Sequence, residues 1–211
     1  MARITVFGGT GYTGLAIVRE AVARGHEVTS VSRNAASDPI PRVIYVHGSL
    51  LSGDPGSLVA DAEVVVAAMS PRGDLAGKIA DIYTSLAEAA IQTGAQFVVI
   101  GGFSSLRRTP GGPRIADSDV LDPRFAAEAR ELSGFADWLL TTPEDLDWLY
   151  ISPAAGYGAF APGEVRGTYR IGGDVVLENS QPELSAPDFA AAVVDVIESG
   201  QHHREHLSVT Y

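Results

Sequence analysis

Short apolar runs alternate with longer amphipathic stretches along most of the chain. The first run, residues 3–7 (RITVF), ends in glycines and is typical of a buried strand. The next stretch, residues 12–24, carries apolar side chains at helical spacing and precedes Gly25, a residue type that commonly ends helices. The same patterns predict further strands at 27–32, 43–47, 63–68, 96–101, 147–152 and 206–210, and helices at 75–93, 124–141 and 187–199.

The order of these elements predicts the architecture. Strands that alternate with helices form a mainly parallel sheet with helices on both faces. We therefore expect an α/β fold of the doubly wound Rossmann type, in a single domain over residues 1–211 with a small C-terminal extension on the substrate side. Within that extension, residues 167–171 and 174–178 surround Gly172-Gly173 and predict a hairpin.

Ligands of such sheets bind beyond the carboxyl ends of the strands, near the point where the strand order reverses. The longest irregular stretches, 103–123 and 153–166, each follow one of these predicted strand ends. Long loops in a compact domain are usually functional. We expect these two loops to form the substrate side of the protein.

The sequence FGGTGYTG at residues 7–14 lies where the first strand gives way to the first helix. Its glycines Gly8, Gly11 and Gly14 permit a tight turn, a close approach of the main chain to a pyrophosphate, and close packing of helix on strand. The start of the helix then offers free N–H groups to phosphates. The alternative is a flexible turn without a ligand, but the strand before it and the amphipathic helix after it favour dinucleotide binding.

A basic residue stands where many NAD-binding units have an acidic one. The second strand ends in TSVSRN, which places Arg33 about 20 positions after the glycine loop. A guanidinium there would pair with the 2′-phosphate of NADP(H). We therefore predict that NADP(H) is preferred and NAD(H) possible, the alternative being that Arg33 is a solvated surface residue.

The composition excludes several classes of protein. The 211 residues include no cysteine, which excludes disulfides and thiolate chemistry. The formal net charge is −11, which argues against a nucleic-acid partner. No apolar run approaches the ~18 residues of a membrane span, and the N-terminus leads directly into a strand pattern. We expect a cytoplasmic protein without a membrane partner, either a monomer or a homodimer.

Several blocks together resemble one known family. They are GGTGYTG, VSRN, GGFSSL at 101–106, DWLYISPAAGYGAFAPGE at 147–164, RGTYRIGGD at 166–174 and LSAPDFAAAVVDVIE at 184–198. With these blocks the chain resembles an atypical short-chain dehydrogenase/reductase, and more narrowly the NADH-flavin reductase and biliverdin-IXβ-reductase-like NAD(P)-binding group. The resemblance covers essentially the whole chain.

This resemblance implies a set of cofactor-binding residues. Gly8, Thr10, Gly11, Tyr12, Thr13 and Gly14 would hold the pyrophosphate, and Arg33 with Asn34 the adenosine phosphate. Ser49 and Leu50 would flank the adenine, although many relatives have an acidic residue at the position of Ser49. Ala67, Ala68, Met69 and Ser70 would lie beside the ribose, and Ser152, Pro153 and Ala154 near the nicotinamide.

The chain lacks the Tyr-xxx-Lys pair with which many short-chain dehydrogenases exchange a proton with the substrate oxygen. Its only lysine is Lys78, and the residue four positions earlier is Asp74. Hydride transfer to a flavin or tetrapyrrole requires less, because the acceptor delocalises the charge and solvent supplies the proton. A conjugated small molecule is therefore the predicted acceptor.

The loops after the fifth and sixth strands supply the candidate catalytic residues. Ser104 and Ser105 could donate a hydrogen bond to the acceptor, or could simply cap a turn. Tyr157, with Phe103 and Phe160, could form an aromatic platform, or Tyr157 and Phe160 could pack the loop onto the core.

Two clusters of charged or titratable residues each allow two interpretations. Arg107 and Arg108 could meet an anionic substrate or offset the acidic residues of their own loop. His202, His203 and His206 suggest a metal site, but no acidic or cysteine partner stands at ligand spacing, so a solvated turn without metal is favoured.

The main functional hypothesis is an NAD(P)H-dependent reductase that transfers hydride from NADPH to a flavin, quinone or other conjugated acceptor. The alternative is a non-catalytic sensor that binds NADP(H) and signals its redox state to a partner. A nucleotide-sugar epimerase is disfavoured, because it would also need the Tyr-Lys pair and a larger C-terminal domain.

Overall fold

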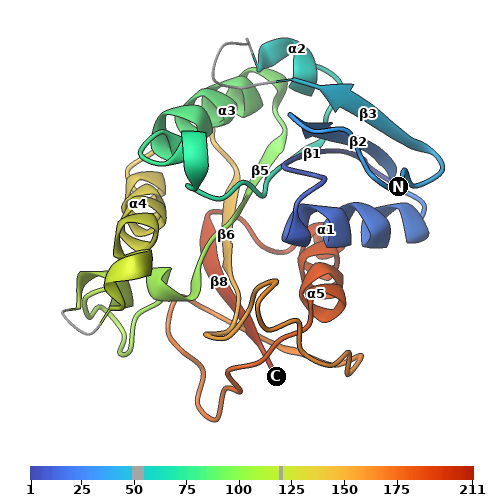
Figure 1. Cartoon of the computed structure of the whole chain (residues 1–211). Coiled ribbons are helices and arrows are strands. Elements are labelled where there is room, and N and C mark those ends of the chain that lie inside the picture. Colours follow the sequence, from blue (N-terminus) through green and yellow to red (C-terminus); the bar gives the residue numbers. More distant parts are fainter. Residues whose placement is uncertain (49–54, 119–120) are drawn as a thin grey trace.

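The computed structural model describes residues 1–48, 55–118 and 121–211 and contains one eight-stranded sheet, shown in Figure 1. Its strand order is β3-β2-β1-β4-β5-β6-β8-β7, and every neighbouring pair is parallel except β7 and β8. The strands are β1 (Arg3–Phe7), β2 (Glu27–Ser32), β3 (Val43–His47), β4 (Val64–Ala67), β5 (Gln96–Ile100), β6 (Trp148–Ser152), β7 (Arg170–Gly172) and β8 (Glu205–Thr210).

Helices cover the sheet on both sides. Helices α1 and α5 pack together on one side, and α3 and α4 lie on the other (Figure 1). The helices are α1 (Tyr12–Ala23), α2 (Gly56–Val59), α3 (Ile79–Thr93), α4 (Pro123–Leu139) and α5 (Ala186–Ser199), with 3-10 turns η1 (Gly73–Leu75), η2 (Phe103–Ser105) and η3 (Ile115–Asp117). A mainly parallel sheet with helices on both faces confirms the predicted doubly wound α/β fold. None of the described helices is long and apolar enough to cross a membrane.

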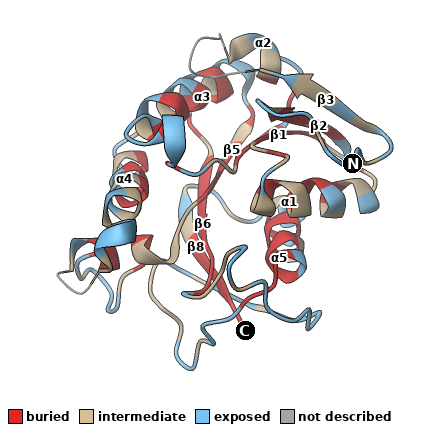
Figure 2. Cartoon of the chain, viewed as in Figure 1, coloured by how far each residue is buried: buried red, intermediate tan, exposed pale blue. Residues whose placement is uncertain are grey.

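The two sides of the sheet form two hydrophobic cores. Successive residues of β4 point to opposite sides, so Val64 and Val66 join the core under α1 and α5, while Val65 and Ala67 join the core under α3 and α4. Because both faces are covered, the central strand β4 is apolar throughout rather than alternating. Figure 2 shows the central strands as a buried layer between helices that are buried mainly on their inner faces.

The sheet topology fixes where a ligand can bind. The chain runs outward from β1 through β2 to β3, then returns to place β4 on the other side of β1. The strand order thus reverses at β1, and the segments that leave β1 and β4 diverge at this point. A crevice at the carboxyl ends of these strands follows from the topology.

The predicted hairpin at 167–178 is wrong. Only Arg170–Gly172 forms a strand, and it pairs antiparallel with β8 at the edge of the sheet. The second arm is not a strand, because Asp174 and Val176 exchange backbone hydrogen bonds with Arg107 from the loop after β5. Sequence patterns also missed the short helix α2, and the predicted helix at 75–93 begins only at Ile79.

Candidate nucleotide and acceptor cleft

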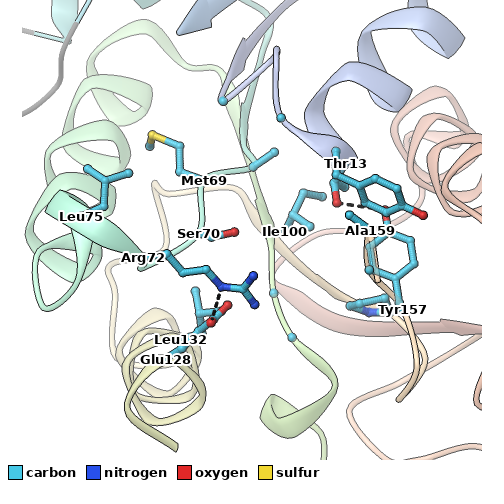
Figure 3. A pocket seen from close by; sticks show the side chains of 18 of the residues that line it. Thr13, Met69, Ser70, Arg72, Leu75, Ile100, Glu128, Leu132, Tyr157 and Ala159 are labelled. Carbon is cyan, nitrogen blue, oxygen red and sulfur yellow. Dashed lines mark hydrogen bonds and ion pairs between the residues drawn. The ribbon is translucent and has the colours of Figure 1, made fainter. Parts of the chain in front are cut away.

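A cleft of about 950 Å³ opens at the carboxyl ends of β1, β4, β5 and β6. Figure 3 shows its two walls, with Ser70, Arg72 and Glu128 on one side and Thr13 and Tyr157 on the other. Its lining includes residues of the glycine loop, the end of β2, the segment after β4, the loop 100–105, the first half of α4 and the loop 153–160. One half of the cleft is therefore built around the glycine loop, and the other around α4 and the two long loops.

The glycine loop has the shape of a phosphate cradle. Gly8 has a φ of +81°, and a Cβ atom there would lie 2.7 Å from the carbonyl oxygen of Ala68. A Cβ on Gly14 would lie 2.2 Å from the carbonyl oxygen of Gly8, too close for any side chain. These glycines let the loop fold onto β4 and let α1 approach β1, as the sequence predicts.

The start of α1 faces the cleft without a side-chain cap. The N-cap residue Gly11 has no side chain to accept a hydrogen bond, and among the described residues nothing accepts one from the N–H groups of Tyr12, Thr13 or Gly14. These groups and the positive end of the helix dipole form an anion site at the cleft wall. The cradle and the bare helix end together fit the pyrophosphate of a dinucleotide.

Arg33 lines the cleft directly after β2, but it already has an acidic partner. Its Nη1 atom donates to the carboxylate of Asp74, which lies in η1. The hydrogen bond from Arg33 holds the pKa of the Asp74 carboxyl below its ordinary value. Sequence reasoning identified the arginine but not this partner, because the two residues are 41 positions apart.

The half of the cleft around α4 combines apolar side chains with an ion pair that crosses between two segments. Arg72 Nε donates to Glu128 Oε2 at 2.7 Å, joining the segment after β4 to α4. Phe125 lies on the same face of α4, and Phe160 extends from the opposite loop with 72% of its surface exposed. Neither Arg72 nor Glu128 could be predicted from the sequence, because they meet only where the segment after β4 lies against α4 in the fold.

The three candidate catalytic residues all line the cleft, but two of them have other partners. Ser105 is 1% exposed, and its hydroxyl lies 2.9 Å from the hydroxyl of Tyr150. Tyr150 donates to the carbonyl of Leu132, so Ser105 is the donor in its own bond to Tyr150 and is already engaged. Ser104 is partly buried, and no described residue bonds to its hydroxyl.

Tyr157 joins the loop after β6 to the glycine loop. Its hydroxyl lies 2.9 Å from Thr13 Oγ1, and its ring packs against Tyr12 and Phe189 at centroid distances of 5.6 and 4.8 Å. Burial raises the pKa of Tyr157 above its ordinary value, so the phenol stays protonated at neutral pH. This geometry favours the packing role for Tyr157, whereas the exposed Phe160 remains the better candidate for an aromatic platform.

A buried hydrogen-bond chain supports the floor of the cleft from behind. Arg114 can only donate, so His206 Nδ1 accepts from it at 3.1 Å and His206 Nε2 must carry the proton. That N–H donates to Ser152 Oγ at 2.9 Å, and the Ser152 hydroxyl donates to the carbonyl of Gly102 at 2.9 Å. Burial, and secondarily the charge of Arg114, lowers the pKa of His206 to about 3.

This hydrogen-bond network corrects the expectation of a solvated turn for one of the three histidines, His206. His206 is a partly buried residue of β8, whereas His202 and His203 lie on the connection before that strand and bond to Glu205 and Asp147. Among the described residues, no group of acidic and histidine side chains is arranged to hold a metal ion.

Neither Arg107 nor Arg108 lines the cleft in the part of the chain that the structure describes. Arg107 pairs with Asp174 at 3.0 Å and with Asp137 at 3.4 Å, so it anchors the loop after β5 to the C-terminal segment. Arg108 is exposed. The structure therefore gives no support to a substrate anion bound by this pair.

The predicted cofactor residues fall into three groups. The largest group lines the cleft: Gly8, Thr10, Gly11, Tyr12, Thr13, Arg33, Asn34, Ala68, Met69, Ser70, Pro153 and Ala154. Gly14, Ala67 and Ser152 are buried behind the wall, where they support the residues that line it. Ser49 and Leu50 lie outside the described residues.

The sheet topology, the glycine cradle and the bare end of α1 define a Rossmann-type dinucleotide-binding protein. The family model for NAD(P)H-binding proteins matches residues 8–200. The chain therefore belongs to this NAD(P)H-binding family of atypical short-chain dehydrogenases/reductases, as its motifs predict.

Similar proteins share the whole length of the chain. The uncharacterized protein YwnB of Bacillus subtilis (strain 168) is 27% identical over 216 residues, which cover 98% of this chain and 97% of YwnB. A solved structure from Burkholderia pseudomallei, described as a "putative exported protein", is 33% identical with a TM-score of 0.85, and both chains are covered in full. A Streptococcus pneumoniae TIGR4 structure described as a "putative NADH-flavin reductase" is 26% identical with a TM-score of 0.84, covering 100% and 99% of the two chains.

A further relative is similar over part of its length. The dTDP-6-deoxy-L-talose 4-dehydrogenase (NAD(P)(+)) of Kitasatospora kifunensis is 30% identical over 134 residues, which cover 58% of this chain and 42% of that enzyme. The family thus includes NAD(P)-dependent dehydrogenases, and the shared part is too short to carry that enzyme's substrate over to this chain.

Proposed function

We propose that this protein is an NAD(P)H-dependent reductase that prefers NADPH and transfers hydride to a flavin, quinone or other conjugated acceptor. The observation that carries the proposal is the two-part cleft, in which a phosphate cradle continues into an apolar, aromatic half. When bound, a reduced nicotinamide supplies the hydride. The protein contributes the binding of both molecules and their orientation.

The preference for a conjugated acceptor follows from the groups that face the cleft. Among the described lining residues there is no lysine, and Lys78 is exposed elsewhere. Tyr157 bonds to Thr13 and has a raised pKa, so it is poorly suited to exchange a proton with an alkoxide. An acceptor that spreads the incoming charge over a ring system does not need such a donor and can take its proton from water.

The half of the cleft around α4 and the two long loops, called the acceptor half below, also suits a planar, largely apolar molecule. Leu75, Leu132 and Ala129 supply apolar surface, and Phe125 and Phe160 supply ring faces. The Arg72–Glu128 ion pair in this half carries no net charge. The description of the pneumococcal neighbour as a "putative NADH-flavin reductase" is in keeping with an acceptor of this type.

The same lack of an acid–base pair also suits a redox sensor that binds NADP(H) without turnover. An acceptor screen separates the two functions. Purified protein is mixed with NADPH and, in turn, FMN and a naphthoquinone, and the absorbance of reduced nicotinamide is followed. The reductase predicts consumption well above the protein-free rate for at least one acceptor. Binding of NADPH without any acceleration would instead identify a sensor.

A further inference from the structure

The acidic partner of Arg33 comes from the segment after β4. Arg33 follows β2, and Asp74 lies in η1, which follows β4. Strands β2 and β4 flank β1 in the sheet. The Arg33–Asp74 pair therefore joins the two segments that border the end of β1, on the side where Arg33 would meet the adenosine part of a dinucleotide.

The pair is exposed enough to open when a stronger anion arrives. The side chains of Arg33 and Asp74 are 42% and 54% exposed, and ion pairs this close to solvent contribute little to stability. A phosphate monoester carries a charge of about −1.5 to −2 at neutral pH and offers three acceptor oxygens. It is therefore a better partner for the guanidinium than one carboxylate.

We propose that Asp74 is a cofactor-selectivity residue, whose carboxylate competes with the 2′-phosphate of NADP(H) for Arg33. When NADP(H) binds, Asp74 loses its partner and faces a like charge. When NAD(H) binds, no phosphate reaches Arg33 and the pair remains intact. Asp74 thus narrows the difference in affinity between the two cofactors and lets the protein accept both.

The inference rests on the proposed function only for its cofactor, and it is tested without any acceptor. NADPH and NADH are titrated separately into the wild type, Asp74→Asn, Arg33→Ala and the double variant, with binding followed by nicotinamide fluorescence. Asp74→Asn should tighten NADPH up to about fivefold and change NADH by less than about twofold. Asp81→Asn, which removes an exposed carboxylate from the first turn of α3, is the matched control and should favour neither cofactor.

The double variant tests whether Asp74 acts through Arg33. Without Arg33, the substitution Asp74→Asn should no longer strengthen NADPH binding selectively. Equal tightening of both cofactors, no tightening of NADPH, or a selective gain that persists without Arg33 would overturn the proposal. Failure of both dinucleotides to bind would also overturn it, whereas tight binding without reduction of any acceptor would count only against the reductase.

Discussion

The two halves of the cleft are built from different parts of the chain. In the cofactor half, the glycine loop and the first turn of α1 present main-chain N–H groups, and their positions are set by the register of β1 and β4. In the acceptor half, side chains such as Phe125, Glu128 and Phe160 form the surface, and they come from a helix and a loop far apart in sequence. A main-chain site constrains its sequence tightly, whereas a side-chain site can change its ligand with few substitutions.

The largest expected effect comes from adding one methyl group to the cofactor half. In Gly14→Ala the new Cβ would lie 2.2 Å from the Gly8 carbonyl oxygen, so α1 must shift away from the loop. Overpacking of this kind costs about 1–3 kcal/mol, and we expect NADPH affinity to fall roughly tenfold to a hundredfold. Titration of folded protein, verified by its thermal melt, measures the loss.

Gly134→Ala is the control for that experiment. Gly134 is an exposed residue of α4 with open space around its Cβ position. Alanine there should leave NADPH affinity unchanged and stabilise the protein by up to about 1 kcal/mol, through helix propensity. If both variants bind NADPH equally well, the main-chain account of the cofactor half is wrong.

The hydrogen-bond chain behind the acceptor half should make stability depend on pH. His206 is neutral in the folded protein, with a pKa lowered from 6.5 to about 3, while in the unfolded chain it takes up a proton near pH 6.5. The unfolded state therefore binds more protons between these values, and this residue lowers the free energy of unfolding as pH falls, by at most about 1.4 kcal/mol per pH unit.

Replacing the histidine should remove that contribution. Denaturant unfolding at several pH values between 3 and 6.5 should show a shallower loss of stability for His206→Gln than for the wild type. His203→Gln should not flatten the slope, because the bond to Asp147 raises the pKa of His203 and gives that residue the opposite sign. An unchanged slope in His206→Gln would show that the imidazole is not held neutral.

Removing an aromatic ring from the acceptor half should weaken the binding of the acceptor and leave the binding of NADPH unchanged. Phe125 is 43% exposed on α4, so Phe125→Ala removes a ring face without opening the core. Aromatic contacts contribute about 0.5–1.5 kcal/mol, which predicts an acceptor KM raised roughly two- to twelvefold with NADPH affinity unchanged. Steady-state kinetics with the acceptor varied measures this. A matching loss of NADPH affinity would mean that the two halves do not bind separate molecules.

The smallest effect is expected where the two halves meet. Tyr157→Phe removes the hydrogen bond to Thr13 but keeps the ring packing on Tyr12 and Phe189. We expect kcat to fall by less than about tenfold, the typical scale of one neutral hydrogen bond. A loss of about 100-fold or more would be typical of general acid–base catalysis and would make Tyr157 a catalytic residue.

The contrast between the halves also explains what the sequence could predict. The strand and helix order, the glycine cradle and the position of Arg33 were all predictable, because local periodicity and glycine spacing encode them. Asp74, Arg72 and Glu128 were not, because their roles depend on how the segment after β4 lies against the end of β2 and against α4. The hairpin prediction was wrong for the same reason, because the backbone of Asp174 and Val176 forms hydrogen bonds with the distant residue Arg107 instead of with the first arm.

The proposed reductase depends on one cleft that brings reduced nicotinamide and a conjugated acceptor together. Its most direct test is a single-turnover experiment in which protein saturated with NADPH is mixed rapidly with a naphthoquinone and the nicotinamide fluorescence is followed. We expect a decay far faster than that of free NADPH with the same quinone, and slower decay in Phe125→Ala at subsaturating quinone. A decay no faster than the protein-free reaction, with NADPH demonstrably bound, would contradict it.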